Sequence, residues 1–367
     1  MTTATSSAEP PLIVGAGPTG LAAALFLRER GIPARIIDSA SEPTTHSKAL
    51  GVNPRTLDLL ESTGVTDRML ETGRMARGMN LWRPDRKLAT INLGGTGHRF
   101  PFMLVLSQAE SERLLTEALT ERGITVERGV GLTDIATANG GITATLSTGE
   151  TLTPSVVLGA DGAHSTVRKS LGRDFPGSAY PEPWHLYDAR LQTTLDDEFI
   201  NAFLLDDGVL LFIRIKENLW RIVSNVTDPL GQLPAGTTVE AVEWDSEFGF
   251  AHRIAKPLYA DNICLAGDAA HIHSAFGARG MNLGIEDAYV FAALVAENRL
   301  SEYEAHRRPV IESVVKRVAR ATEIPRGKSL SAKLVRRFPS VVSWLAPKAE
   351  SAVRTWVLGL DHDLDIE

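Results

Sequence analysis

The chain has 367 residues, of which 43% are hydrophobic and 23% charged, a composition that excludes wholesale disorder and predicts roughly two domains. The formal net charge of −7 gives no basic footprint for nucleic acid. No apolar run approaches the ~18 residues of a membrane span, and Met1 to Pro10 lack the apolar core of a signal peptide. The one cysteine, Cys264, excludes internal disulfides. We therefore expect a soluble cytoplasmic protein whose partners are neither nucleic acids nor membranes.

The first elements are a strand, a helix and a second strand. Leu12 to Val14 is an apolar run typical of a strand, and Leu21 to Arg30 has the Ala and Leu content of a packed helix. Gly31 ends that helix, and Ala34 to Asp38 forms the second strand. Such a unit predicts a parallel sheet with a right-handed crossover, and hence an α/β fold.

Further along, helices are predicted at 54–61 and 109–122, and strands at 142–146 and 155–158 that return to the first sheet. Alternating runs then follow at 184–191, 199–205, 209–215 and 219–226. Asp207-Gly208, between two of them, is a strong hairpin turn. We expect a separate antiparallel sheet here. Helical sequence resumes at Met281 and continues to the end of the chain.

Gly15-Ala16-Gly17-Pro18-Thr19-Gly20 is a G-x-G-x-x-G sequence between the first strand and the first helix. The first two glycines let the backbone approach a pyrophosphate, whose charge is stabilised by the free N–H groups of the helix. Asp38 ends the second strand about 20 residues later, where a carboxylate accepts ribose hydroxyls. The pattern predicts dinucleotide binding, but by itself it does not separate NAD from FAD.

Two later segments make that distinction. One runs from Gly159 through Asp161 to Arg168, and the other contains Gly267-Asp268 followed by Gly277 to Asn282. Together with the glycine-rich loop, they resemble the three sequence motifs of the para-hydroxybenzoate hydroxylase-like, class A FAD-dependent aromatic hydroxylases. The resemblance covers most of the chain, with the motifs in the right order.

The resemblance implies FAD as the cofactor and NADPH or NADH as the reductant. It also implies a Rossmann-like FAD-binding domain of the glutathione-reductase type, an inserted antiparallel substrate domain and C-terminal helices. We place the FAD-binding domain at 1–175 and 262–320, a shortened substrate domain at 176–261 and a C-terminal helical segment at 321–367. The residues expected to contact FAD are Gly15, Gly17, Pro18, Thr19, Gly20, Asp38, Ser39, Lys48, Gln108, Asp161, Asp268, Gly277, Gly280, Met281 and Asn282.

Individual roles follow from the family and from simple physics. A helix that starts near Met281 would direct its free N–H groups at the isoalloxazine and stabilise the reduced flavin by ~0.3–2 kcal/mol. Asp268 would contact the ribityl hydroxyls. Asp161 and Arg168 would support the flavin and the nicotinamide nucleotide. The alternatives are a common Asp-Gly turn for Asp161 and a surface ion pair for Arg168.

The sequence departs from the family at three places. Lys48 stands where the family usually has arginine, so a point charge replaces a bidentate fork. Ala275 stands where proline is usual beside the reactive edge of the flavin, which removes a fixed φ. The segment from Asp228 to Trp244 is short, so part of the cover of the substrate domain is expected to be trimmed.

The resemblance implies a monooxygenase that hydroxylates an aromatic or polyketide-like molecule with O₂, through a flavin hydroperoxide. Baeyer–Villiger oxidation, epoxidation and dehydrogenation use the same motifs and remain open, as does an accessory flavoprotein without oxygenase activity. The W-x-W-x-I-P sequence of flavin-dependent halogenases does not occur here.

Candidates for the substrate pocket are His46, Tyr187, Phe212, Arg214, Arg221, Ala275 and Phe276. For each of them, ordinary packing or solvation is the alternative. His271 and His273 have the spacing of metal ligands but lack a third ligand, so no metal is expected. The basic segment from His306 to Arg354 is interpreted as helix packed on its own FAD domain, with membrane contact as the less favoured reading. The protein is expected to be a monomer or homodimer.

Overall fold

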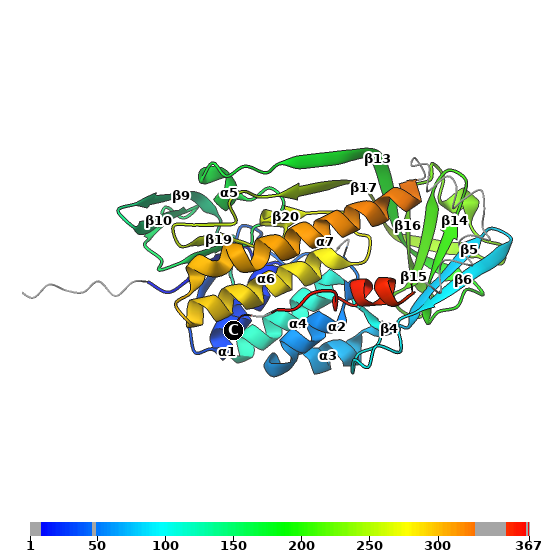
Figure 1. Ribbon diagram of the computed structural model, residues 1–367, viewed down its shortest axis with the longest axis horizontal. Coiled ribbons are helices and arrows are strands. Elements are labelled where there is room, and N and C mark those ends of the chain that lie inside the picture. Colours follow the sequence, from blue (N-terminus) through cyan, green and yellow to red (C-terminus); the bar gives the residue numbers. More distant parts are fainter. Residues whose placement is uncertain (1–8, 46–48, 327–349, 365, 367) are drawn as a thin grey trace, which may run out of the picture.

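The computed structural model describes residues 9–45, 49–326, 350–364 and 366. Within these residues the chain is a mixed α/β protein with a six-stranded sheet, an eight-stranded sheet and two three-stranded sheets. The six-stranded sheet and its helices form one end of an elongated molecule, and the eight-stranded sheet forms the other end (Figure 1).

The six-stranded sheet has the order β18-β19-β12-β1-β2-β8. The pairs of β1 with β2 and β12, of β12 with β19 and of β2 with β8 are parallel, and β18 is antiparallel to β19. Its strands are β1 (Leu12–Val14), β2 (Arg35–Asp38), β8 (Glu127–Arg128), β12 (Val157–Gly159), β18 (Tyr259–Ala260) and β19 (Ile263–Leu265). The parallel pairing of β1 with β2 that the sequence predicts is therefore present.

The helices form because local sequence starts them and tertiary contacts bury them. Pro18 opens α1, Asn53 accepts a hydrogen bond from Thr56 N at 2.9 Å to cap α2, and Ser107 caps α4. The helices are α1 (Pro18–Glu29), α2 (Pro54–Leu60), α3 (Val65–Thr72), α4 (Gln108–Glu121), α5 (Thr166–Ser170), α6 (Arg279–Ala296) and α7 (Tyr303–Arg326), with a further helix at 350–357.

The eight-stranded sheet has the order β20-β17-β13-β16-β15-β14-β5-β6 and is antiparallel except between β14 and β5. Two long strands, β13 and β17, form a ribbon that runs from the six-stranded end of the molecule into this sheet (Figure 1). Its strands are β5 (Gly78–Arg83), β6 (Arg86–Asn92), β13 (Gly177–Gln192), β14 (Phe199–Leu204), β15 (Val209–Arg214), β16 (Leu219–Ser224), β17 (Thr238–Ile254) and β20 (His271–Ile272).

The structure agrees with the predicted hairpin at Asp207-Gly208, where Leu205 N donates to Gly208 O at 3.0 Å. The strand predicted at 142–146 exists, but its return to the first sheet was wrong. That strand, β10 (Gly141–Leu146), pairs with β9 (Leu132–Ala138) and β11 (Thr151–Leu152) in a separate sheet. The sequence of a strand determines how its side chains alternate between the two faces, but not which strand it pairs with.

Two other features were not expected from the sequence. The segment 228–244 contains the start of β17, whose 17 residues make it the longest described strand. Strands β5 and β6 come from far earlier in the chain and extend the eight-stranded sheet. A last small sheet consists of β3 (Gly51–Val52), β4 (Arg74–Ala76) and β7 (Met103–Val105).

Helices α1 and α6 approach each other closely because glycine faces Thr19. A Cβ on Gly284 of α6 would lie 2.3 Å from Thr19 Oγ1, and one on Gly267 would lie 2.6 Å from the same atom. Real Cβ atoms do not come so near, so both positions require glycine while Thr19 is present. Thr19 is thus a packing residue between α1, α6 and the end of β19.

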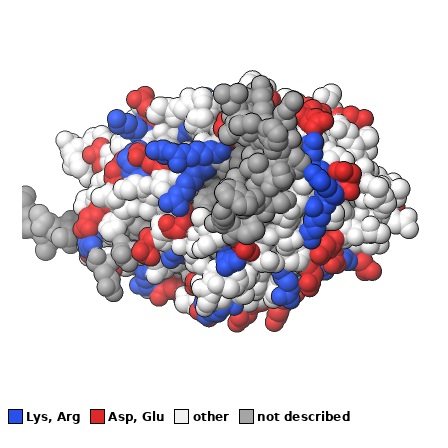
Figure 2. Space-filling view, turned by 45° about the vertical axis from the view of Figure 1, so that its right-hand side comes forward, with Lys and Arg blue, Asp and Glu red and all other residues white. Residues whose placement is uncertain are grey.

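The outer surface carries charges of both signs. Figure 2 shows Lys and Arg interspersed with Asp and Glu on the face in view. Among the described residues, none of the helices combines the length and the apolar character that crossing a lipid bilayer requires.

We predict that Gly284→Ala destabilises the protein by ~1–3 kcal/mol, because the new methyl overpacks the contact with Thr19. Thr19→Ala should restore much of that loss in the double variant, since it removes Oγ1. Urea denaturation of the four proteins in this cycle measures the coupling. Gly249→Ala is the control, because nothing lies within 4 Å of its Cβ position. Equal losses with and without Thr19→Ala would contradict the packing argument.

Candidate cofactor and substrate site

The glycine-rich loop after β1 combines two close contacts with one open face. A Cβ on Gly15, whose φ is +103°, would lie 2.3 Å from Ala160 O, and one on Gly20 would lie 1.9 Å from Gly15 O. At Gly17, by contrast, nothing lies within 4 Å of the Cβ position. Gly15 and Gly20 therefore let β1, α1 and the segment after β12 pack together, while Gly17 leaves space for a ligand at the start of α1.

That open face belongs to a cavity of about 460 Å³. Four segments distant in sequence meet there, and they contribute Gly17, Asp38, Gln108 and Asp268. These are four of the residues that the sequence analysis singled out. The other lining residues are Ala16, Ala40, Glu42, Thr44, Glu112, Arg128 and Trp244. The volume is in the range of ~300–1,000 Å³ of small-molecule sites.

Asp38 fixes the shape of one wall of this cleft. Its Oδ2 accepts a hydrogen bond from Ala16 N at 2.6 Å, and its Oδ1 accepts one from Ala40 N at 2.8 Å. Arg128 Nη1 lies 3.6 Å from Oδ2. A carboxylate has further lone pairs, so Asp38 can position the loop and still accept ribose hydroxyls.

Among the cleft residues that the sequence analysis missed, two contact predicted ones. Glu112 is buried and accepts a hydrogen bond from Gln108 Nε2 at 2.8 Å, and burial raises the pKa of its carboxyl group. Arg128 Nη2 is buried and has no hydrogen-bond partner among the described residues. The i, i+4 spacing of Gln108 and Glu112 was a usable signal. Nothing in the sequence placed Arg128 beside Asp38, because that contact depends on the pairing of β2 with β8.

Asp161 and Arg168 connect the motif after β12 to the motif after β19. Asp161 Oδ2 accepts hydrogen bonds from Thr166 N at 2.7 Å and Val167 N at 3.1 Å, while its Oδ1 is buried and unpartnered within the described chain. Arg168 donates to Ala269 O at 2.9 Å and to Ala163 O at 2.8 Å. Arg168 is buried and thus bridges two motifs through backbone carbonyls, and no ion pair of Arg168 is found among the described residues.

A buried ionic cluster holds the Gly-Asp motif from behind. Asp287 of α6 accepts hydrogen bonds from Gly267 N at 3.0 Å and Arg307 Nε at 2.7 Å, and it lies 2.6 Å from His271 Nε2. Burial opposes its ionisation, but the charges of Arg307 and His271 hold the pKa of Asp287 below its ordinary value. The Nε2 atom of His271 is therefore occupied by its contact with Asp287. Burial lowers the pKa of His273 to about 4.

The segment before α6 turns through two left-handed residues, Gly277 with φ +80° and Ala278 with φ +52°. Ala278 N donates to Ala275 O at 3.0 Å, which closes the turn. The side chain of Asn282 is occupied by the protein itself: its Oδ1 accepts from Asn53 N at 3.0 Å, and its Nδ2 donates to Gly51 O at 2.9 Å. Asn282 therefore holds α2 and β3 against the start of α6.

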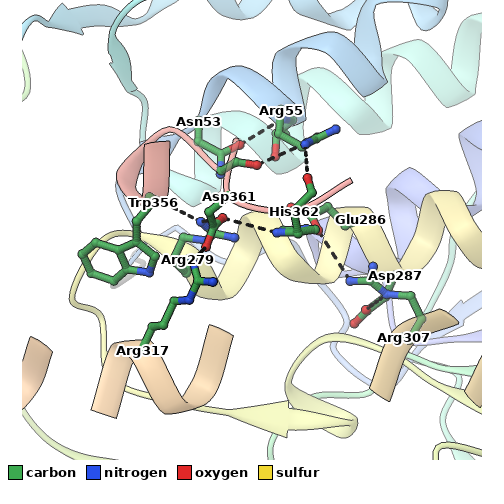
Figure 3. Close-up of polar contacts among 12 residues, drawn as sticks. Asn53, Arg55, Arg279, Glu286, Asp287, Arg307, Arg317, Trp356, Asp361 and His362 are labelled. Carbon is green, nitrogen blue, oxygen red and sulfur yellow. Dashed lines mark hydrogen bonds and ion pairs between the residues drawn. The ribbon is translucent and has the colours of Figure 1, made fainter. Parts of the chain in front are cut away.

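The C-terminal segment covers this turn (Figure 3). Arg279, which is fully buried, donates to Trp356 O and pairs with Asp361 at 2.9 Å. A Cβ on Gly277 would lie 2.6 Å from the indole ring of Trp356. The contacts join the end of the chain to the start of α6.

The C-terminal segment is also held at a second point, by the polar contacts of His362. His362 Nε2 lies 2.8 Å from Glu286 Oε2, and Arg55 Nη2 donates to His362 O at 2.5 Å. Burial would lower the pKa of His362, but Asp361 and Glu286 raise it above its ordinary value. Burial would raise the pKa of Asp361, but the hydrogen bond with His362 and the charge of Arg279 lower it to about 2.

The candidate substrate residues lie on both faces of the eight-stranded sheet. One face, with Trp184, Leu211 and Val223, packs against Phe276 of the turn before α6. Tyr187 and Phe212 belong to a core cluster on the other face, and strand alternation puts Arg214, which pairs with Asp197, on that face too. Tyr187, Phe212 and Arg214 therefore lie on the face away from Phe276, which the sequence had left open, and their place in a substrate pocket stays a prediction.

Arg221 of β16 pairs with Ile213 of β15, so the two side chains lie on the same face of the sheet. Its guanidinium makes a bidentate contact with Asp188, with both distances at 2.8 Å, and it is buried.

Phe276 is half-buried, and Ala275 is exposed. Ser39 is exposed next to Asp38, whereas Pro18 and Gly20 belong to α1, and Gly280 and Met281 to the first turn of α6. His46 and Lys48 are outside the described residues.

Comparison with known proteins identifies the family. The FAD binding domain family matches residues 10–209 and 230–318. A rifampicin monooxygenase of Streptomyces venezuelae is 31% identical, over 96% of this chain and 80% of the relative. The chain belongs to the FAD binding domain family. The predicted resemblance and FAD as the predicted cofactor are confirmed.

Other proteins similar to this chain are also named as monooxygenases or hydroxylases. A 6-methylpretetramide 4-monooxygenase of Streptomyces rimosus is 33% identical over 82% of this chain, which spans 59% of that protein. Among solved structures, the p-nitrophenol 4-monooxygenase of Pseudomonas putida has a TM-score of 0.85 with 20% identity, over 96% of this chain and 98% of that chain. The anhydrotetracycline hydroxylase of Streptomyces rimosus has a TM-score of 0.78 with 27% identity, over 97% of this chain and 77% of that one.

The residues of the cleft fit FAD. The open Cβ position at Gly17 lets a diphosphate approach the start of α1, where backbone N–H groups favour an anion. Within the described chain, Arg128, which lines the cleft, offers an unpartnered donor, and Asp161, which lies against Gly15 of the loop, offers an unpartnered acceptor. Buried polar atoms usually have partners, so both atoms are suited to contact a bound cofactor.

We predict that Gly17→Val yields a folded protein that does not retain FAD. The backbone at Gly17, with φ −74° and ψ −177°, accepts a branched side chain, which would fill the open face toward the cleft. The melting temperature of the apoprotein should change by no more than about 4 °C. The measurements are flavin absorbance after purification and thermal unfolding. Gly249→Val, also at an open position, should keep its flavin. A yellow Gly17→Val protein would place the diphosphate elsewhere.

We also predict a pH-dependent attachment of the C-terminal segment. The pKa of His362 is raised in the folded protein from an ordinary value of 6.5, so its stabilisation is complete below pH 6.5 and is lost as the pH rises through the raised pKa. The difference in urea midpoint between wild type and His362→Gln should therefore shrink from about pH 6 to about pH 9. His164→Gln, at an exposed position, is the control. A constant difference across this range would contradict the assignment.

Proposed function

We propose that the protein is an FAD-dependent, NAD(P)H-consuming monooxygenase that hydroxylates an aromatic or polyketide-like small molecule. The observation that carries the proposal is the meeting of Gly17, Asp38, Gln108 and Asp268 at one cleft in a member of this family. Named relatives act as monooxygenases on rifampicin and pentachlorophenol.

In this proposal the six-stranded sheet belongs to a Rossmann-like domain of the glutathione-reductase type, at 1–175 and 262–320. The ribbon and eight-stranded sheet at 176–261 serve the substrate, together with β5 and β6. The parallel order around β1 supports this division, whereas β20, from the range 262–320, crosses it by pairing with β17. Within the predicted C-terminal segment at 321–367, the described residues Trp356 and Asp361 contact the turn and the start of α6.

When bound, FAD supplies hydride acceptance and the activation of O₂. The residues of the chain would orient and enclose the cofactor. The start of α1 and Arg128 would hold the diphosphate, Asp38 would accept ribose hydroxyls, and Asp268 would contact the ribityl hydroxyls; all of these line the same cleft. Asp287 and Arg168 keep the Gly-Asp motif in place through Gly267 N and Ala269 O.

The substrate lies against the sheet face that meets Phe276. Phe276 packs edge-on to Trp184, with ring centroids 5.2 Å apart, and Trp184 is 5.0 Å from Phe250. This aromatic wall excludes water, which protects a reactive oxygen species from side reactions. Trp184 Nε1 is buried without a hydrogen-bond partner in the described chain, so it is suited to donate to a substrate oxygen.

The turn before α6 keeps a defined shape without the proline usual in the family. The hydrogen bond from Ala278 N to Ala275 O and two successive left-handed residues fix the backbone there. Trp356 and Arg279 brace the turn from outside. Ala275 is therefore compatible with oxygenation in this proposal.

The test is anaerobic and then aerobic mixing of the purified yellow protein with NADPH and a panel of phenols, quinones and polyketide aromatics. We expect a substrate to accelerate flavin bleaching and to gain one oxygen atom, detected by mass spectrometry. Loss of two hydrogens instead would indicate dehydrogenation. NADPH oxidation that no compound accelerates, with no oxygenated product, would support an accessory flavoprotein and overturn the proposal.

A further inference from the structure

The sheet face that meets Phe276 also carries an ion pair. Val223 of β16 packs in the same apolar cluster as Phe276, and Arg221 lies two residues before Val223 on that strand. Asp188 of β13 is directly opposite Arg221 in the register of the sheet. Residues two apart on a strand, and residues directly opposite each other, share a face. The Asp188–Arg221 pair therefore lies on the face that Phe276 meets.

The surroundings of the pair on this face are apolar and partly open. Leu211 is opposite Val223, and Ile213 is opposite Arg221, so both belong to the same face. Leu211, Ile213 and Val223 are each half-buried. An aromatic ring system that lies on these side chains would have its edge beside the ion pair.

The carboxylate is the accessible member of the pair. The side chain of Arg221 is 3% exposed and that of Asp188 is 16% exposed. A buried ion pair is often no more stable than apolar side chains of similar volume. Its place among apolar residues therefore points to recognition rather than to stability, and a ligand on this face would meet Asp188 first.

Trp244 connects the pair with the cofactor cleft. Trp244 of β17 is opposite Asp188 in the β13–β17 register, and its ring centroid lies 5.6 Å from the guanidinium carbon of Arg221. Trp244 also lines the cleft at the start of α1. A molecule that contacts Asp188 would therefore lie next to the proposed FAD site.

We propose that Asp188 accepts a hydrogen bond from a phenolic or enolic hydroxyl group of the substrate, and that Arg221 is the positioning residue that holds this carboxylate. The inference rests on the proposed function and names a feature of its substrate. Each oxygen of Asp188 lies 2.8 Å from a nitrogen of Arg221 and keeps a further lone pair. A hydroxyl group that donates to a carboxylate leaves more electron density on its ring. Oxygen insertion is therefore expected at positions ortho or para to that hydroxyl.

The test measures equilibrium binding to the oxidised holoenzyme without NADPH. The probes are 2-naphthol and 2-methoxynaphthalene, which are both uncharged at neutral pH, but only the first can donate a hydrogen bond. We expect the wild type to prefer 2-naphthol by about tenfold or more, because the ether loses a hydrogen bond to a charged group. Asp188→Asn should reduce this preference to about threefold or less, since a neutral acceptor remains.

Two further variants control for the fold. Asp188→Leu/Arg221→Met replaces the pair by apolar side chains and leaves no buried charge unpaired. It should keep its FAD and bind both probes almost equally. Glu243→Gln breaks the exposed ion pair of Glu243 with Arg190, at 2.6 Å between β17 and β13, and should keep the preference of the wild type. A lowered affinity for both probes with an unchanged ratio would show a merely structural role and overturn the inference.

A third probe, 2-naphthoate, separates the two members of the pair. It should bind the wild type more weakly than 2-naphthol, because its carboxylate would face the carboxylate of Asp188. Tighter binding of 2-naphthoate would assign the contact to Arg221 and overturn the inference. A wild type without preference between 2-naphthol and its methyl ether, whether it binds both or neither, would also overturn it.

Turnover separates this inference from the proposed function. A preference for 2-naphthol in a protein that forms no oxygenated product from any phenol, quinone or polyketide aromatic would overturn the proposed function and leave the hydroxyl contact standing. Oxygenated products formed equally well from 2-naphthol and its methyl ether would overturn the inference alone.

Discussion

The candidate cofactor site depends on one buried carboxylate. Asp287, in the middle of α6, binds the backbone of the Gly-Asp motif, His271 of β20 and Arg307 of α7. Removing one partner from a buried ion pair leaves an uncompensated charge at a cost of ~3–5 kcal/mol. The strand end, the following turn and two helices are therefore tied to one point, which fixes the walls of the cleft relative to one another.

Close contacts at glycine complete that frame. Gly15, Gly20, Gly267 and Gly284 all stand where a Cβ would collide with backbone or with Thr19. These contacts bring β1, β12, β19 and the helices α1 and α6 to nearly minimal separation. Gly17 alone of the loop's three motif glycines has open space beside it, so the same motif both packs the domain and admits a ligand.

The C-terminal segment and the β13–β17 ribbon extend this frame toward the substrate. Trp356, Asp361 and His362 brace the start of α6, where the family places the isoalloxazine. The ribbon carries Trp184 against Phe276 of the turn before α6. The proposed substrate surface is thereby connected to the elements that form the cofactor cleft, which suits chemistry that must exclude water.

Local patterns in the sequence were sufficient for the first strand–helix–strand unit, the hairpin at Asp207-Gly208 and the family, because motif spacing and turn residues act over short distances. They also selected Gly17, Asp38, Gln108 and Asp268, which the structure brings to one cleft. The sequence left open which sheet receives β10, which face of β15 meets the turn at Phe276, and that Arg128 lies beside Asp38. Those features were decided by strand pairing and register between distant segments, and the period of a single strand is the same for either partner and either face.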